Sequence, residues 1–266
     1  MKKIVSFMFC AVLILAAHAE IRLPNVLTSN MVLQQGKAVH IWGKADPGAT
    51  LKVSFAGQEK ETPVNADSTW ILSLDPMEAS FEPKILTLQL VKESAETEEI
   101  QLNNILVGEV WICGGQSNME YTMDLSLKRY AVPGRGADLA DQEWRSGGNK
   151  QIRLMRVEKV LSLPDCTTKG WLECADTTLA PFSAAAYYFG KQIQEKLNVP
   201  VGLIGSYWGG SRIEAWIPEK EYKAAAFYQT ECSQHPTVNR SIGHFYKSMI
   251  EPLAPYTLRG AIWYQG

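Results

Sequence analysis

The sequence lacks an excess of charge of either sign. Its 266 residues carry 26 Lys and Arg against 28 Asp and Glu, giving a formal net charge of -2. Hydrophobic residues make up 46% of the chain and charged residues 20%, which excludes a disordered or polyelectrolyte protein. The basic residues are scattered rather than clustered, so no nucleic-acid partner is expected. The length allows one large domain or two modest ones.

The sequence also lacks a long hydrophobic run beyond its first twenty residues. Two lysines precede an apolar run from Ile4 to Leu15, and small residues stand at Ala17 and Ala19. This pattern is typical of a signal peptide over residues 1–19, cleaved after its last residue. A run of about 12 to 16 residues is too short to cross a bilayer, and an uncleaved or lipidated anchor stays the alternative. We expect an exported protein, periplasmic or extracellular, whose mature form has no membrane span.

Cysteines are few, and no metal-binding motif accompanies them. One leaves with the predicted leader, and four remain: Cys113, Cys166, Cys174 and Cys232. Cys166 and Cys174 flank a turn-like segment and are the expected disulfide pair, with a loop worth only about 2.5 kcal/mol of unfolded-chain entropy. Cys113 lies in an apolar run and is expected to be a buried thiol. Without CxxC or HxxxH spacing, we expect neither a metal nor an organic cofactor.

Residues 20–104 have the pattern of a small all-β sandwich domain. Four segments alternate apolar and polar residues with a period of two, at 38–43, 50–55, 70–74 and 84–90. Turn residues separate them, among them the run Asp46-Pro47-Gly48. Trp42 and Trp70 lie on these strands, so we expect them in the core rather than on a sugar-binding surface. No catalytic constellation is visible in this part.

From Ile105 the pattern changes to that of an α/β domain over residues 105–266. Nearly continuous apolar runs lie at 105–114, 151–157, 201–206 and 258–266. Such runs are typical of strands that are buried on both faces of a parallel sheet, and these runs end in polar or glycine-bearing turns. Helices are expected between them, one from about 240 to 253 and one capped by Ser183. The predicted buried face of the latter helix consists of Ala186, Phe189, Ile193 and Leu197. Alternating strands and helices favour a three-layer αβα architecture, with ligands at the carboxyl ends of the strands.

Three of those strand ends carry candidate chemistry. The first leads into Gly114-Gly115-Gln116-Ser117-Asn118, the third into Trp208-Gly209-Gly210-Ser211, and the fourth into Gln265-Gly266. A serine on a glycine-rich turn exposes its hydroxyl and its own N–H, so it can serve as nucleophile and as one oxyanion donor. Glycines at the second turn let backbone N–H groups approach a substrate oxygen. Any one turn alone would be an ordinary polar cap, but their occurrence together favours a site.

The segment GEVWICGGQSNMEY strongly resembles the first motif of the sialate O-acetylesterase family, within the SGNH hydrolases. The resemblance continues through MVLQQGKAVHIWGKADPGATLKVSF, FSAAAYYFGKQI, PVGLIGSYWGGSRIEAW and MIEPLAPYTLRGAIWYQG, so it covers nearly the whole mature chain. It implies an SGNH-hydrolase-like α/β domain preceded by a β domain. It also implies hydrolysis of acetyl esters on sugars.

The resemblance assigns roles to individual residues. It implies that Ser117 is the nucleophile and donates its own N–H to the oxyanion, and that Gly209 or Gly210 supplies a second donor. Ser211 stands where many relatives carry threonine. The candidate substrate-binding or turn-holding residues are Gln116, Asn118, Trp208, Glu214 and Gln265. Glu214 either positions substrate or is a solvated carboxylate. Four tryptophans could stack on sugar faces: Trp111, Trp208, Trp216 and Trp263. Core packing is expected for most of them, and Trp208 is the best candidate for a pocket wall.

Some residues of the family's pattern are missing. The family continues after WYQG with an acidic residue and an asparagine that donates a third oxyanion hydrogen bond, and later with an aspartate and a histidine separated by two residues. The sequence stops at Gly266, before all of them. Neither His235 nor His244 has an aspartate three residues earlier, and His40 lies on a predicted strand. We expect the N-terminal part of a longer esterase, nearly inert by itself; a natural short protein without the chemistry is the alternative.

The leading hypothesis is a serine esterase that removes O-acetyl groups from sialic acid or a related acetylated sugar through an acetyl-Ser117 intermediate. An esterase acting on acetylated xylan is the nearest enzymatic alternative, since related SGNH families share the GQSNM turn. A carbohydrate-binding protein or an inactive esterase remnant is the alternative from another class.

Overall fold

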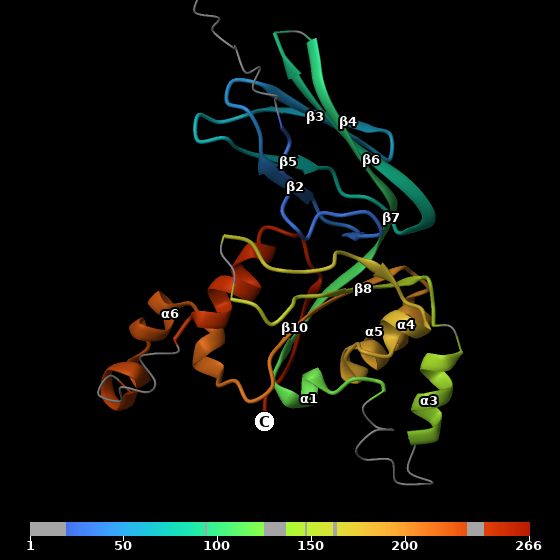
Figure 1. The fold of residues 1–266 in the computed structure, drawn as a ribbon, viewed down its shortest axis with the longest axis vertical. Coiled ribbons are helices and arrows are strands. Elements are labelled where there is room, and N and C mark those ends of the chain that lie inside the picture. Colours follow the sequence, from blue (N-terminus) through green and yellow to red (C-terminus); the bar gives the residue numbers. More distant parts are fainter. Residues whose placement is uncertain (1–19, 94, 125–136, 147, 162–163, 233–241) are drawn as a thin grey trace, which may run out of the picture.

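The computed structural model describes residues 20–93, 95–124, 137–146, 148–161, 164–232 and 242–266 (Figure 1). The predicted leader at residues 1–19 lies outside these ranges. Among the helices that the structure describes, none is both long and apolar enough to cross a membrane. The strands of the N-terminal part gather at one end of the molecule, and the helices surround the strands at the other end (Figure 1).

The N-terminal part consists of strands, in agreement with the period-two pattern, and all of them pair antiparallel except the first, which pairs parallel with a later strand. Their bounds are β1 Val32–Gln34, β2 Val39–Lys44, β3 Thr50–Phe55, β4 Gln58–Pro63, β5 Thr69–Leu74 and β6 Ser80–Lys92. Strand β3 pairs with β4 and β6, while β2 pairs with β5. The inward side chains of both pairings share one core, which contains buried Trp70 and, packed against it, partly buried Trp42. The expected core placement of these two tryptophans is confirmed.

Strand β7, Ala95–Gly115, joins the two parts of the chain. Its first half pairs antiparallel with β6, and its second half pairs parallel with β10 and β11. Every residue from 105 to 110 is buried, as expected for a strand covered on both faces. The strand runs without a break through position 104. The predicted domain boundary therefore falls within one strand, in the region where its neighbours change from β6 to β10 and β11.

The second part is an α/β arrangement, as predicted. Its remaining strands are β8 Ile152–Arg156, β9 Leu172–Glu173, β10 Val201–Tyr207 and β11 Gly260–Tyr264. Its helices are α1 Ser117–Glu120, α3 Ala137–Arg145, α4 Asp176–Leu179, α5 Ala184–Leu197, η1 Ile213–Trp216, α6 Glu219–Ala224, η2 Tyr228–Cys232, η3 Tyr246–Ile250 and η4 Glu251–Leu253. The order β11-β7-β10-β8 is parallel throughout, and β9 adds an antiparallel edge.

The sheet has a hydrophobic core on each face. Helix α5 packs against β10 and β8 on one face, together with buried Val201 and Leu203. On the other face Ile204 belongs to the core that also contains Met249 of η3, and the Ser206 hydroxyl donates to the Met249 carbonyl at 3.0 Å. Alternate residues of β10 therefore face opposite cores, which fixes the helices on both sides of the strand.

Helix α5 begins as predicted, and its predicted face lies against the core except at the last residue. The Ser183 hydroxyl accepts the Ala186 N–H at 3.1 Å, which confirms the predicted cap. Ala186 is buried, and Ile193 packs against the same core. The expected burial of Leu197 is wrong, since this side chain is 53% exposed. Gly190 also faces the sheet, where a Cβ would lie 2.6 Å from the Leu203 side chain, so the helix approaches β10 through a residue without a side chain.

The expected Cys166–Cys174 disulfide is wrong. Both thiols are free and buried, and they belong to the two separate cores on opposite faces of the sheet. Burial raises the pKa of Cys166 to about 12 and that of Cys174 to about 11, so both are protonated at neutral pH. The segment between the two cysteines therefore connects the two cores and does not form a disulfide-closed loop.

Candidate active site

Three strand ends meet at one edge of the sheet, as the sequence predicts. Gly115, the last residue of β7, is in register with Tyr207 of β10 on one side and Tyr264 of β11 on the other. Gly115 has a φ of +138°, and a Cβ there would lie 2.1 Å from the Tyr264 carbonyl oxygen. A side chain at this position would push the strands apart, so the turn before Ser117 requires glycine.

Hydrogen bonds tie the three turns together. The Trp208 N–H donates to the Gly115 carbonyl at 3.1 Å, which joins the second turn to the first. The Gln116 N–H donates to the Tyr264 carbonyl at 3.1 Å, and its side-chain amide donates to the Gly266 carbonyl. The Gln265 amide donates to the Ser211 carbonyl at 2.8 Å, which joins the third turn to the second. Gln116 and Gln265 therefore hold the turns.

Ser117 lies at the first position of α1 and is exposed. No residue within the described ranges forms a hydrogen bond with its hydroxyl. Gly209 lies beside it, because a Cβ built on that glycine would be 3.6 Å from both the Cα and the Cβ of Ser117. The nucleophile candidate and the second glycine turn thus lie side by side.

A carboxylate that the sequence analysis did not select lies between these two turns. Glu120, the last residue of α1, accepts the Gly209 N–H through Oε2 at 2.5 Å. Its other oxygen forms an ion pair with Lys159. The N–H of Gly210, whose φ is +77°, makes no hydrogen bond within the part of the chain that the structure describes. Of the two candidate donors, Gly210 is the one that is still free to donate.

Trp208 lines a pocket beside the second turn. The pocket has a volume of about 320 Å³ and is bounded by Trp208, Gly209, Gly210, Ser211, Arg212, Ala215 and Phe245. The centre of the Trp208 ring is 4.8 Å from that of the Phe245 ring. Lys159 Nζ lies 5.9 Å from the centre of the same Trp208 ring. Trp208 is therefore a pocket wall, as predicted, and its ring is fixed by its neighbours.

The remaining candidate residues divide into supporting and exposed groups. The Ser211 hydroxyl accepts the indole N–H of buried Trp216 at 2.9 Å, so it serves the core. Glu214 is buried, with an ion pair to Arg212 at 3.6 Å, and the interpretation of a solvated carboxylate is wrong. Asn118 is exposed and faces the third turn, since its Nδ2 is 3.5 Å from a Cβ built on Gly266.

Two titratable side chains near the strand ends stay protonated because they are buried. Cys113 lies near the end of β7 and is fully buried, and burial raises the pKa of its thiol far above neutrality. Burial likewise raises the pKa of Tyr207. Both groups stay protonated, and the expectation that Cys113 is a buried thiol is confirmed.

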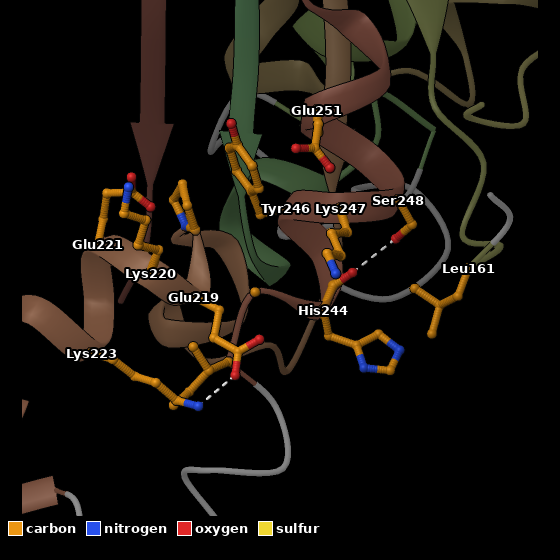
Figure 2. A pocket seen from close by; sticks show the side chains of 13 residues that line it. Leu161, Glu219, Lys220, Glu221, Lys223, His244, Tyr246, Lys247, Ser248 and Glu251 are labelled. Carbon is orange, nitrogen blue, oxygen red and sulfur yellow. Dashed lines mark hydrogen bonds and ion pairs between the residues drawn. The ribbon is translucent and has the colours of Figure 1, made fainter. Parts of the chain in front are cut away.

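Two of the four histidines fall within the described residues. His40 on β2 shares a 2.9 Å hydrogen bond with Ser73, and His235 lies outside the described residues. His244 lines a cavity of about 700 Å³ between α6 and η3, in which the Glu219 and Lys223 side chains point toward each other (Figure 2). That cavity contains neither Ser117 nor either glycine of the second turn. That His244 is not the base for Ser117 stays a prediction.

Comparison with known proteins gives relatives of one kind. The chain is 31% identical to human sialate O-acetylesterase over 259 residues and 29% identical to the mouse protein of that name over 292. These matches cover 92% of this chain but 48% and 51% of the relatives. A carbohydrate acetylesterase from Xanthomonas citri has the same fold, with a TM-score of 0.76 and 29% identity over 93% of this chain and 51% of that one. No protein-family model matches.

The chain thus spans about half the length of the curated relatives it matches. Its sequence similarity to them covers nearly all of its own residues, and its fold is similar to that of the Xanthomonas citri carbohydrate acetylesterase. The chain is therefore related to the sialate O-acetylesterases, as its motifs predict.

Proposed function

We propose that this protein is an esterase that removes O-acetyl groups from sugars, with Ser117 as the nucleophile. The observation that carries the proposal is the exposed Ser117 on a glycine turn beside Gly209. Gly209 and Gly210 of this second turn line a pocket together with Trp208. Relatives named for sialate and carbohydrate acetyl esters support the substrate class. The finer assignment within that class is the O-acetyl group of sialic acid.

The proposed reaction is acyl transfer. Ser117 Oγ attacks the acetyl carbonyl carbon while a base accepts the hydroxyl proton, and the carbonyl oxygen becomes an oxyanion. The N–H groups of Ser117 and Gly210 donate to that oxyanion. When the tetrahedral intermediate collapses, the bond to the sugar oxygen breaks and that oxygen takes up the proton. Water then attacks the acetyl-serine in the same way and releases acetate. We assign the base to no described residue, and the reaction as written uses no cofactor.

Acetate release measures the proposal directly. The protein in its full-length form, its Ser117→Ala variant and the remote control Ser54→Ala are assayed on O-acetylated sialic acid and on acetylated xylan. We expect Ser117→Ala to lose about 10⁶-fold in kcat and the control to lose nothing. A serine-directed phosphonate should label Ser117 alone. Sugar binding that survives Ser117→Ala without acetate release from the wild type would favour a carbohydrate-binding protein, and preferential release from xylan would favour the xylan esterase.

We also propose that residues 1–19 direct export to the periplasm or the extracellular medium. The two basic residues, the short apolar run and the small residues at 17 and 19 support this proposal. Mass spectrometry of the protein recovered from the producing cell's exterior should give an N-terminus at residue 20. An N-terminus at Met1 or a lipid-modified cysteine would contradict it.

We infer that the chain has two structural parts, an all-β sandwich at residues 20–104 and an SGNH-hydrolase-like α/β part at residues 105–266. The shared core of the β2–β5 and β3–β4–β6 pairings supports the first, and the parallel order β11-β7-β10-β8 supports the second. Because β7 belongs to both parts, the boundary between them lies within a strand and not in a linker.

A further inference from the structure

Glu120 connects the two turns on which the proposed chemistry depends. It lies three residues after Ser117 in α1, so both side chains emerge from the same side of one helical turn. Its carboxylate accepts the Gly209 N–H at 2.5 Å, and a Cβ on Gly209 would lie 2.8 Å from the same oxygen. The glycine therefore fits between the nucleophile and the carboxylate, and a hydrogen bond to an ionised acceptor holds it there.

The carboxylate is itself held in place. Lys159 forms an ion pair with its second oxygen, and the same ammonium group lies 5.9 Å from the centre of the Trp208 ring. The Glu120 and Lys159 side chains are only 26% and 35% exposed. Glu120, Lys159 and the Trp208–Gly210 turn thus form a clamp across three separate segments of the chain. With Gly209 engaged, the adjacent N–H of Gly210 remains free.

We propose that Glu120 is a positioning residue for the Ser117 esterase. By holding the Gly209 N–H, it fixes the distance between the second turn and Ser117 and directs the Gly210 N–H toward the substrate oxygen. This inference rests on the proposed function. Since displacement of a catalytic group by about 1 Å costs about 100-fold in rate, loss of the clamp should lower kcat while leaving the binding of a small ester nearly unchanged.

Three variants separate the acceptor from the charge. Glu120→Ala removes both, Glu120→Gln keeps an oxygen for the Gly209 N–H, and Lys159→Met removes only the ion pair. In the full-length form of the protein, with 4-nitrophenyl acetate as substrate, we expect Glu120→Ala to lose about 100-fold in kcat with KM changed by less than about twofold. Glu120→Gln and Lys159→Met should retain kcat within about tenfold. Glu219→Ala, which breaks an exposed ion pair of the same type in α6, is the matched control and should behave as wild type.

A second measurement does not require turnover. Hydrogen exchange of the peptide that contains Gly209 should be slow in wild type and Glu120→Gln and faster in Glu120→Ala, because only the last variant lacks an acceptor. If Glu120→Ala fails to fold, Glu120→Met, which removes the acceptor but keeps most of the side-chain volume, takes its place in both measurements.

Several outcomes would overturn the inference. Unchanged kcat in Glu120→Ala, equal losses in Glu120→Ala and Glu120→Gln, or a rise in KM alone would each show that the acceptor does not position the turn. Equal Gly209 exchange in wild type and Glu120→Ala would do the same. Full activity in Ser117→Ala contradicts the proposed function instead, and the exchange measurement then tests the clamp by itself.

Discussion

At the scale of single residues, Gly115 is the position where the proposed site tolerates least change. We expect Gly115→Ala to lower the free energy of unfolding by about 3 kcal/mol or more, because its φ of +138° and the contact with Tyr264 both oppose a Cβ. Gly48→Ala is the control, since Gly48 also has a positive φ but no atom within 4 Å of a built Cβ. It should lose only about 1 to 2 kcal/mol.

Urea unfolding of both variants measures the difference. If the free energy of unfolding falls no more in Gly115→Ala than in Gly48→Ala, strands β7 and β11 can separate at this edge of the sheet without loss of stability. In that case the close approach of β11 would not be what keeps the turn in shape.

The motif residues could be predicted because they are adjacent in sequence to buried strands. Ser117 and the glycines at 209 and 210 are recognised by their turns, and the register of three parallel strands brings those turns together. Glu120 could have been suspected from its spacing of one helical turn from Ser117. Lys159 could not, because its ion pair joins segments about 40 positions apart in a region without a strand or helix pattern.

At the scale of elements, a buried ion pair connects β7 to the start of β11. Glu109 is 1% exposed and accepts two hydrogen bonds from Arg259, at 2.6 and 2.7 Å, and one from Gln35 at 2.7 Å. We expect Glu109→Gln to lower the free energy of unfolding at pH 7 by about 2 kcal/mol. Glu82→Gln, which removes an exposed pair with Lys84, should change it by less than about 0.5 kcal/mol.

This pair also predicts a pH dependence. Burial would raise the pKa of Glu109, but the hydrogen bonds from Arg259 and Gln35 outweigh it, and the pKa in the folded protein is lower than the ordinary 4.5. The stabilisation is therefore fully present above pH 4.5 and is lost as the pH falls through the lowered value. Urea midpoints between pH 7 and 3 should fall less steeply in Glu109→Gln than in wild type. Parallel curves would contradict this account.

The strands that the sequence analysis missed have little apolar signal. Strand β4 is polar along its whole length and alternates between half-buried and exposed residues at the edge of the sheet, so it lacks the pattern that marks a buried strand. The first half of β7 is also polar and forms a strand because β6 pairs with it. Strands with one covered face were predictable, whereas edge strands depend on a neighbour that is distant in sequence.

At the scale of the molecule, the open edge of β11 carries aromatic side chains. Strand β11 pairs only with β7 among the described strands, and Trp263 and Tyr264 are 40% and 48% exposed. An apolar edge of this kind favours pairing between copies. We expect residues 20–266 to self-associate through this edge as the concentration rises. The variant Tyr264→Lys should associate less.

Light scattering after size-exclusion chromatography measures this association. Leu197→Lys, which changes an equally exposed apolar residue at the end of α5, is the control and should associate as wild type does. A monomer at every concentration, or equal effects of the two lysine variants, would show that the edge does not drive association.

The continuity of β7 has a consequence for how this protein can be taken apart. At roughly 3.3 Å per residue its 21 residues extend for about 65 Å, with the β6 hairpin at one end and Ser117 immediately beyond the other. A cut between residues 104 and 105 would deprive one fragment of the strand that completes its sheet and leave the other with a severed central strand. Neither fragment could be exchanged as a module, and a protease would find no hinge there. We therefore expect the two parts to fold together.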